Sequence, residues 1–336
     1  MAGLAQYSIF FENPLLTETI KEVPVPATFI GQEYLPAVES YEMEWHETVI
    51  ERQADMANIV DNGAELPLTD RDPMSTVSGQ IVDMGQSYIV DKKELGALLD
   101  KGNAQRRLIA EKQLLGKTAT VKSNIDARVE WMRWQALGSG ALTYNKDGII
   151  LGVDFKVPSG NKKIAGTKWD DINPTILADL ELWNQSYVDL NGMTPDDFVC
   201  GISIIRTIMN DAGVRLGVTG LTNKLLTIEE LNAFLRGRQM APLRAFDTSV
   251  TYRDVNNNGV RVSQRLLSAK VGVFLVRGSM IGEQIMGPTI ENKMNPGIYA
   301  RTFTQERPMR EIVEVVASSF PKVKEPKLIM PCTVML

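Results

Sequence analysis

Histidine and cysteine are almost absent from this chain of 336 residues, and their scarcity removes most familiar catalytic and metal sites. His46 is the only histidine, so a Ser-His-Asp or Cys-His mechanism would have to use it. No supporting motif surrounds it, and we predict no catalytic role for it. Cys200 and Cys332 are the only cysteines, which excludes a Cys/His zinc centre. Two buried thiols in a reducing compartment are the predicted state.

Phosphate-binding and carboxylate-based sites are also poorly supported. The glycine-rich stretch 213–220 lacks the Gly-Lys-Ser/Thr ending of a phosphate loop, and we predict a mobile loop after a helix. Acidic runs occur at 70–72, 170–171 and 196–197, and in the last two we attribute the aspartates to capping of helix starts and turns. We predict no catalytic, cofactor-binding or metal-binding residues; a carboxylate-dependent enzyme stays an alternative.

A surplus of basic charge is missing as well. Lys and Arg total 36 against 41 Asp and Glu, a net charge of -5, which argues against a tight grip on a nucleic-acid backbone. Lys21 is the first basic residue, so the start does not resemble a secretory signal. No run approaches the roughly 20 apolar residues that span a bilayer. We expect an intracellular protein without a membrane segment.

The first 92 residues predict two segments that cannot be stable alone. Residues 1–44 are predicted to form an extended arm, because Pro14 and three later prolines interrupt every helical pattern. Its isolated apolar residues are expected to pack against a neighbouring subunit. Residues 45–92 predict a long hairpin, with strand-like stretches on either side of a turn-rich tip at 61–73. Such a two-stranded ribbon is only marginally stable and needs a partner surface.

The strongest helical pattern lies between 94 and 138. After a short piece ending near Gly102, apolar residues at spacings of four, three and four predict a helix of about five turns from near Thr118 to just before Gly138. Trp131 and Trp134 flank this stripe and are interpreted as core residues. The two arginines at 106–107 are interpreted as a solvated or subunit-facing charge pair.

A mixed region follows. Hairpins are predicted at 141–157 and 249–262, and buried strands at 197–201 and 271–276. A helix is predicted from an Asn173 cap to Gly192, a second at 202–210 that Gly213 stops, and a third after the capping box that opens at Thr227. Strands at 298–303, 312–318 and 328–330 complete an α+β pattern.

The order of these elements resembles the major capsid proteins of tailed phages with the Hong Kong 97-type fold. In local sequence the chain is most similar to the lambda-type major head protein family. The residues that carry the likeness are 106–107 running through 127–130 to 138, 141–155, 166–169 with 173–174, 260–278 and 331–336.

The resemblance implies a self-assembling shell protein with five parts. These are an N-terminal arm (1–44), an extended loop (45–92), a peripheral domain (93–166) with a spine helix at about 118–138, an axial domain (167–300), and strands returning to the peripheral domain (301–336). It also implies hexamers and pentamers of this chain, a scaffold, a portal, a possible decoration protein and packaged double-stranded DNA nearby. The expected location is the virion, after assembly in the host cytoplasm. A bacterial nanocompartment shell is an alternative of the same fold.

Overall fold

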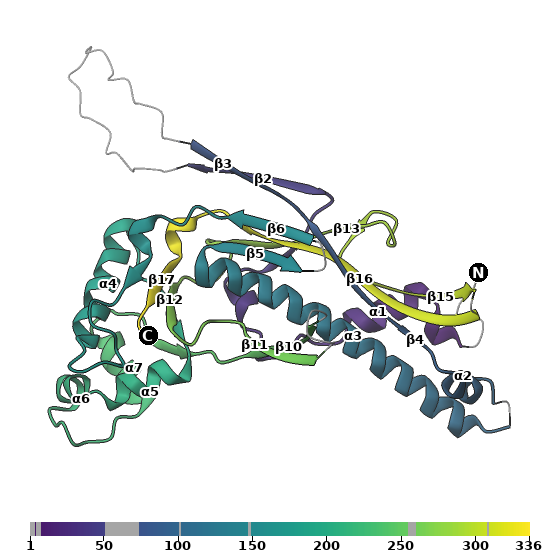
Figure 1. Cartoon of the computed structure of the whole chain (residues 1–336), viewed down its shortest axis with the longest axis horizontal. Helices are drawn as coiled ribbons and strands as arrows, with labels where there is room; N and C mark the ends of the chain where they lie inside the picture. The colour runs from purple at the N-terminus through teal and green to yellow at the C-terminus, as the bar shows by residue number, and fades with distance from the viewer. Residues whose placement is uncertain are drawn as a thin grey trace, which may run out of the picture.

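The computed structural model describes Leu4 and residues 8–50, 74–100, 102–146, 149–254, 260–307 and 309–336. Figure 1 shows an elongated molecule in which one long helix runs beneath a large sheet. A cluster of shorter helices surrounds a second sheet at one end, and a two-stranded ribbon stands off the body. This mixture of helices and mainly antiparallel sheets confirms the predicted α+β class.

In chain order, the α-helices are α1 (Asn13–Lys21), α2 (Lys92–Leu98), α3 (Ala104–Ser139), α4 (Ile176–Asn191), α5 (Ile202–Asn210), α6 (Ala212–Thr219) and α7 (Ile228–Gly237). The strands are β1 (Ala37–Glu39), β2 (Glu44–Ile50), β3 (Met74–Gln80), β4 (Val82–Ile89), β5 (Ala141–Lys146), β6 (Ile149–Asp154), β7 (Lys163–Ile164), β8 (Asp197–Cys200), β9 (Leu243–Ala245), β10 (Ser249–Asp254), β11 (Val260–Arg265), β12 (Val271–Leu275), β13 (Gly282–Thr289), β14 (Asn295–Pro296), β15 (Tyr299–Glu306), β16 (Met309–Val323) and β17 (Met330–Thr333).

The six-stranded sheet is organised around β16. Its main order is β1-β13-β16-β15, while β4 pairs with the other edge of β16 and β14 pairs with β13. The outer edge of β15 is closed by helix α1 rather than by another strand. The Thr17 hydroxyl accepts the Ala300 N–H at 3.1 Å and donates to the Ala300 carbonyl at 3.0 Å, and Asn13 Oδ1 accepts the Thr302 N–H at 3.0 Å. Side chains of α1 thus replace a missing strand.

The five-stranded sheet, ordered β7-β17-β12-β8-β9, lies among α4 to α7. Its β9 edge is also closed by a side chain: Asn232 accepts the Leu243 N–H at 2.7 Å and donates to the Leu243 carbonyl at 3.0 Å. Strand β17 belongs to this sheet, whereas β13, β15 and β16 belong to the six-stranded one. The strands expected to return together at 301–336 therefore divide between the two sheets.

Helix α3 is the longest element, and its predicted start near Thr118 was wrong. The helix begins at Ala104, where the Asn103 side chain accepts the Arg106 N–H, and it runs 36 residues. It passes through Gly116, because an interior glycine costs only about 1 kcal/mol relative to alanine. Gly140 ends it at a φ of 70°, and a Cβ there would lie 2.5 Å from a methyl of Val157, so only glycine fits.

The N-terminal segment, residues 8–43, differs from the predicted extended arm. Pro14 does not interrupt a helix; it lies in the first turn of α1, where its missing N–H costs nothing. The expectation that the apolar residues pack on a neighbour was also wrong for Phe11, Leu16, Ile20 and Tyr34, which are buried in their own chain. The segment is thus part of the body that it was expected to leave.

The predicted hairpin near 45–92 is present, with a shorter reach at its C-terminal side. Strands β2 and β3 pair from Glu44 with Gln80 to Ile50 with Met74, and they form the ribbon of Figure 1. The turn-rich tip at 61–73 lies outside the described residues. Strand β4 leaves the ribbon and pairs with β16. Gly79 lies within β3 and Gly85 within β4, so neither glycine interrupts its strand.

Other predictions were confirmed or corrected at single elements. The structure confirms the strand pairs at 141–154 and 249–265, the strands β8 and β12, helix α5 and the Thr227 capping box. Helix α4 begins at Ile176 after Thr175, not at an Asn173 cap, although Gly192 does end it. The predicted loop at 213–220 is helix α6, because Asp211 caps it by accepting the Val214 N–H at 2.8 Å.

The body has one continuous apolar core. Trp134 of α3 stacks on Phe246 with ring centroids 4.2 Å apart, and Phe198 meets Phe274 at 4.5 Å inside the five-stranded sheet. Both tryptophans of the predicted helical stripe are buried, which confirms their interpretation as core residues. Across the described part of the chain, none of the helices has the length and apolarity needed to cross a bilayer.

Candidate assembly surfaces

His46 lies in strand β2 of the ribbon. Its side chain is 66% exposed, and its Nε2 lies 3.9 Å from Glu44 Oε2. The neighbouring Trp45 turns the other way, is fully buried and stacks on Phe320 of β16 at 5.7 Å. An exposed histidine beside one exposed carboxylate does not resemble the hydrogen-bonded pairs of base and nucleophile found in catalytic sites.

The two cysteines are both fully buried and free, as predicted. Cys200 ends β8, and Cys332 lies in β17. Burial raises the pKa of both thiols, so they stay protonated and unreactive at neutral pH. Among the residues that the structure describes, no group of three or more His, Cys, Asp or Glu side chains could hold a metal ion.

Asp197, itself buried, is the centre of a partly exposed ion-pair network, although its sequence context had suggested only a capping role. It accepts hydrogen bonds from Arg277 at 2.7 and 2.9 Å and from the Tyr34 hydroxyl at 2.7 Å. Arg244 of β9 binds Glu33 at 2.5 and 2.7 Å, and its hydrogen bonds lower the pKa of that carboxyl. The network fastens the N-terminal segment to the five-stranded sheet.

The other acidic runs have simpler places. Asp171 accepts the N–H of the following residue, Ile172, at 2.7 Å, as predicted for a turn. Asp196 instead accepts the N–H of Arg277, which is distant in the sequence, at 2.8 Å, so the prediction of a local cap was wrong for Asp196. Asp170 accepts the Leu336 N–H at 3.3 Å. The run at 70–72 lies outside the described residues. The described aspartates of these runs thus bind backbone N–H groups or arginines in the fold.

Glu130 on α3 holds the N-terminal segment against the helix. Its carboxylate is fully buried and accepts the Gly31 N–H at 2.7 Å, the Trp134 indole N–H at 2.8 Å and Arg133 at 3.3 Å. A Cβ on Gly31 would lie 2.8 Å from both carboxylate oxygens, so glycine permits this close approach. A buried carboxylate needs such a set of donors to remain in place.

Two turns earlier on α3, Lys122 repeats the same arrangement with opposite charge. Its Nζ donates to Asp126 at 2.7 Å and to the Val23 carbonyl at 2.8 Å. Desolvation by burial raises the pKa of Asp126 in spite of its lysine partner. Lys122, Asp126, Glu130 and Trp134 are each four residues apart, so they lie along one face of the helix. This spacing is the sequence signal that could have revealed the contact.

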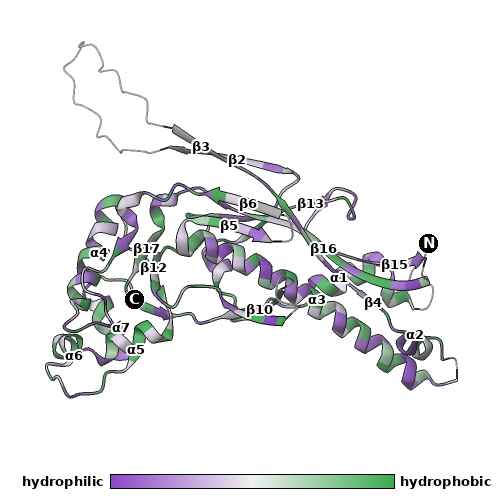
Figure 2. Cartoon of the chain, viewed as in Figure 1, coloured by the Kyte–Doolittle hydropathy of each residue, from purple (hydrophilic) through white to green (hydrophobic). Residues whose placement is uncertain are grey.

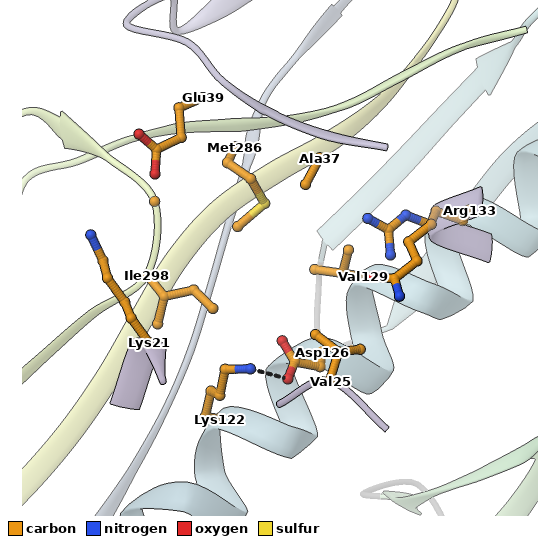
Figure 3. A pocket seen from close by; sticks show the side chains of 12 residues that line it. Lys21, Val25, Ala37, Glu39, Lys122, Asp126, Val129, Arg133, Met286 and Ile298 are labelled. Carbon is orange, nitrogen blue, oxygen red and sulfur yellow. Dashed lines mark hydrogen bonds and ion pairs between the residues drawn. The ribbon is translucent and has the colours of Figure 1, made fainter. Parts of the chain in front are cut away.

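Lys122 and Asp126 border a hollow of about 310 Å³ between α3, the N-terminal segment and β13 (Figure 3). Figure 3 shows the Lys122–Asp126 pair on one side of it and the Arg133 guanidinium on the other, with Met286 and Ile298 opposite. Arg133 Nε is buried without a hydrogen-bond partner. The acids at the hollow are paired with cations or lie apart, which suits attachment of a segment better than acid–base chemistry.

Exposed apolar side chains gather at two ends of the molecule and along the base of the ribbon. At the end formed by α4 to α6 (Figure 2) they are Leu182, Leu190, Leu216, Leu221 and Leu225, the last 80% exposed. At the opposite end they lie where α2 meets α3, and beside the ribbon they include Met43 and Ile290. Several such surfaces on one chain are typical of a protein that contacts copies of itself or partners.

Comparisons with known proteins agree with this arrangement. A family model described as phage major capsid protein E matches residues 15–334. A prophage protein from Escherichia coli CFT073, described as a capsid protein, covers 94% of both chains at a TM-score of 0.59 and 15% identity. A phage-related protein from Bordetella bronchiseptica RB50 covers 95% of this chain and 96% of its own at 0.57 and 12%. No curated protein gave a match.

The capsid protein of Myoviridae phage XM1 has the same fold, with a TM-score of 0.50 and 12% identity over 88% of this chain and 87% of its own. At these identities the structures support the fold, and the Hong Kong 97-type prediction is confirmed. The family model spans nearly the whole chain, including the ribbon and both sheets. The chain therefore belongs to the phage major capsid protein E family, the shell-forming structural proteins of the virion.

Proposed function

We propose that copies of this chain assemble as hexamers and pentamers into an icosahedral head around the double-stranded DNA of a tailed phage. The observation that carries the proposal is the ribbon. Its two strands stand away from the body (Figure 1), and a pair of strands is marginally stable without a further surface. A neighbouring copy supplies such a surface, and many modest contacts then add up over a closed shell.

Different parts of the chain would have different roles in this assembly. The six-stranded sheet with α3 forms the peripheral domain, and the five-stranded sheet with α4 to α7 forms the axial domain, which includes β7 and β17. The ribbon is the extended loop that reaches a neighbour. The N-terminal arm is attached to its own α3 through the Gly31 N–H and the Val23 carbonyl.

We further propose that the chain is not an enzyme. His46 is solvated, both thiols are buried, and Asp126, Glu130 and Asp197 are engaged by cations or backbone N–H groups. The net charge of -5 suits a container that lies beside packaged DNA without holding it tightly. Assembly in the host cytoplasm, with a scaffold and a portal and with a decoration protein outside, completes this proposal.

The test is expression of the full chain followed by sedimentation and electron microscopy. We expect large particles, sheets or tubes, formed by the chain alone or on addition of its scaffold. A compact monomer at all concentrations, with or without the scaffold and with a protease-resistant ribbon, would contradict the proposal. Particles that contain an enzyme cargo instead of DNA would favour the nanocompartment alternative.

A further inference from the structure

Two separate surfaces of the molecule complement each other in charge and in apolar character. The first, which we call the acidic groove, consists of two hollows of about 300 and 260 Å³ that meet at Asp83. It lies at the base of the ribbon, between β4 and the turn after β13. Glu44 and Asp83 are acids on its border, and no basic residue is among the described residues that line it.

The floor of the acidic groove is apolar and open. Met43, Ile81, Ile290 and Met294 line the larger hollow, and Met43 and Ile290 are 60% and 78% exposed. Asp83 has no hydrogen bond or ion pair from its side chain within the described part of the chain. A hollow of this size accommodates one or two aliphatic side chains, with a cation above them.

The second surface, which we call the elbow, comprises α2 and the first turns of α3, at residues 92–100 and 102–112. Leu99, Leu108 and Ile109 are 48%, 50% and 54% exposed at the end of the molecule farthest from the helical cluster (Figure 1). Figure 2 shows hydrophobic and hydrophilic residues side by side along this end of α3. Leucine and isoleucine side chains at a helix end are suitable for insertion into an apolar hollow.

Basic residues surround the apolar side chains of the elbow. Arg106 is held by Asp100 at 3.2 Å. Lys92, Lys93, Arg107 and Lys112 are exposed and form no ion pair among the described residues. The elbow therefore presents unpaired cations next to three exposed aliphatic side chains, which is the chemical complement of the groove.

The two surfaces cannot meet within one chain. Asn124 of α3 donates to Gln86 at the groove at 2.7 Å, which fixes the groove beside the middle of the helix. Ile109 lies 15 residues earlier on the same straight helix, about 22 Å away at 1.5 Å per residue. Only the elbow of another copy can reach the groove.

We propose that the elbow of one copy docks in the acidic groove of a second copy, with Leu108 in the apolar hollow and Arg107 facing Asp83. The contact joins two different surfaces, so each copy offers one elbow and one groove. Such head-to-tail contacts either close into rings or continue indefinitely, and both are means of building a lattice. This inference rests on the proposed shell function and identifies one of the contacts by which copies associate.

Cysteine pairing tests the contact directly, because the native thiols are buried and would not interfere. Chains carrying Leu108→Cys are mixed with chains carrying Met294→Cys, both residues being exposed, and oxidised with copper phenanthroline. We expect a disulfide-linked dimer in the mixture and none in either variant alone. Leu190→Cys, with a similarly exposed side chain on α4, replaces Leu108→Cys as the control. Equal dimer with the control, or none with Leu108→Cys, overturns the proposal.

A charge exchange gives a second, independent measurement. Asp83→Lys and Arg107→Glu are each expected to raise the protein concentration needed for half-maximal assembly about tenfold, and the two changes in one chain should restore it to within about twofold. Glu18→Lys makes the same charge change as Asp83→Lys at an exposed residue of α1 and is the control. If the unaltered chain does not assemble at all, the proposed shell function is contradicted. If both single variants assemble normally, only this contact is contradicted.

Discussion

The N-terminal segment and the ribbon follow one another in the chain, yet they are attached to the body in different ways. Residues 8–43 contact α3 through Glu130 and Lys122, the β15 edge through Thr17, and the five-stranded sheet through Glu33. The ribbon stands away from the body (Figure 1), and among its described side chains Trp45, at its base, is the large buried one. The difference teaches that low apolar content alone does not decide which segment leaves the body. Polar groups of α3 hold the first segment, and no described side chain of the ribbon has such a partner on α3.

The largest effect is expected from breaking the attachment of the N-terminal segment. Glu130→Ala removes the acceptor of three donors and leaves Arg133 buried without its partner, so we expect a loss of about 3–5 kcal/mol in the free energy of unfolding. Urea denaturation measures it. Glu111→Ala on the same helix is the control, and an equal loss there would show that the buried contact is not the cause.

The anchor of the ribbon should come next. Trp45→Ala removes a fully buried indole from Phe320, which we expect to cost about 3 kcal/mol locally and to speed proteolysis between β2 and β3. The exposed neighbour gives the control, His46→Ala, whose cleavage rate should stay unchanged. Unaltered cleavage of Trp45→Ala would mean that the ribbon is held by contacts other than this side chain.

Closure of the β15 edge by α1 is a smaller contribution. Thr17→Val leaves the Ala300 N–H and carbonyl without their hydroxyl partner, at a cost of about 1–2 kcal/mol in denaturant unfolding. Thr19→Val is the matched control, because that hydroxyl bonds only to the Leu15 carbonyl of its own helix. Equal losses of unfolding free energy in the two variants would show that closure of the β15 edge is not the cause.

The smallest effect concerns pH. Hydrogen bonds from Arg244 lower the pKa of Glu33 below its ordinary 4.5, so the folded state favours the ionised carboxylate. The resulting stability is present above pH 4.5 and is lost as the pH falls through the lowered value. Urea midpoints between pH 6 and pH 3 should fall less steeply for Glu33→Gln. Asp126, whose pKa burial raises, acts in the opposite direction in both proteins and cancels in the difference.

Sequence patterns revealed those elements that local chemistry determines. The Thr227 capping box, the Gly192 helix end and the apolar strands β8 and β12 needed no long-range information. Sequence patterns failed where contacts between residues far apart in the chain determine the structure. Asp197 looked like a turn residue because Arg277 and Tyr34, its partners, are far away in the chain. The start of α3 was missed because its first turns are exposed, so no apolar periodicity marks them.

The candidate assembly surfaces were predictable only in part. The sequence indicated the ribbon, but not the groove at its base, which β4, β13 and the turn after β13 form together. It indicated the charge pair 106–107 as solvated or subunit-facing, and both arginines are indeed exposed. Whether they face another subunit stays a prediction.

Closure of the two strand edges has a consequence for accuracy when many copies meet at high concentration. A bare strand edge binds almost any extended peptide, because backbone hydrogen bonding carries no sequence preference. Thr17 and Asn13 at β15, and Asn232 at β9, occupy those bonding positions with the chain's own side chains. Other copies therefore cannot add a strand at these two edges. Contacts between copies then depend more on side-chain shape and charge, so a wrongly placed copy can dissociate before it is incorporated.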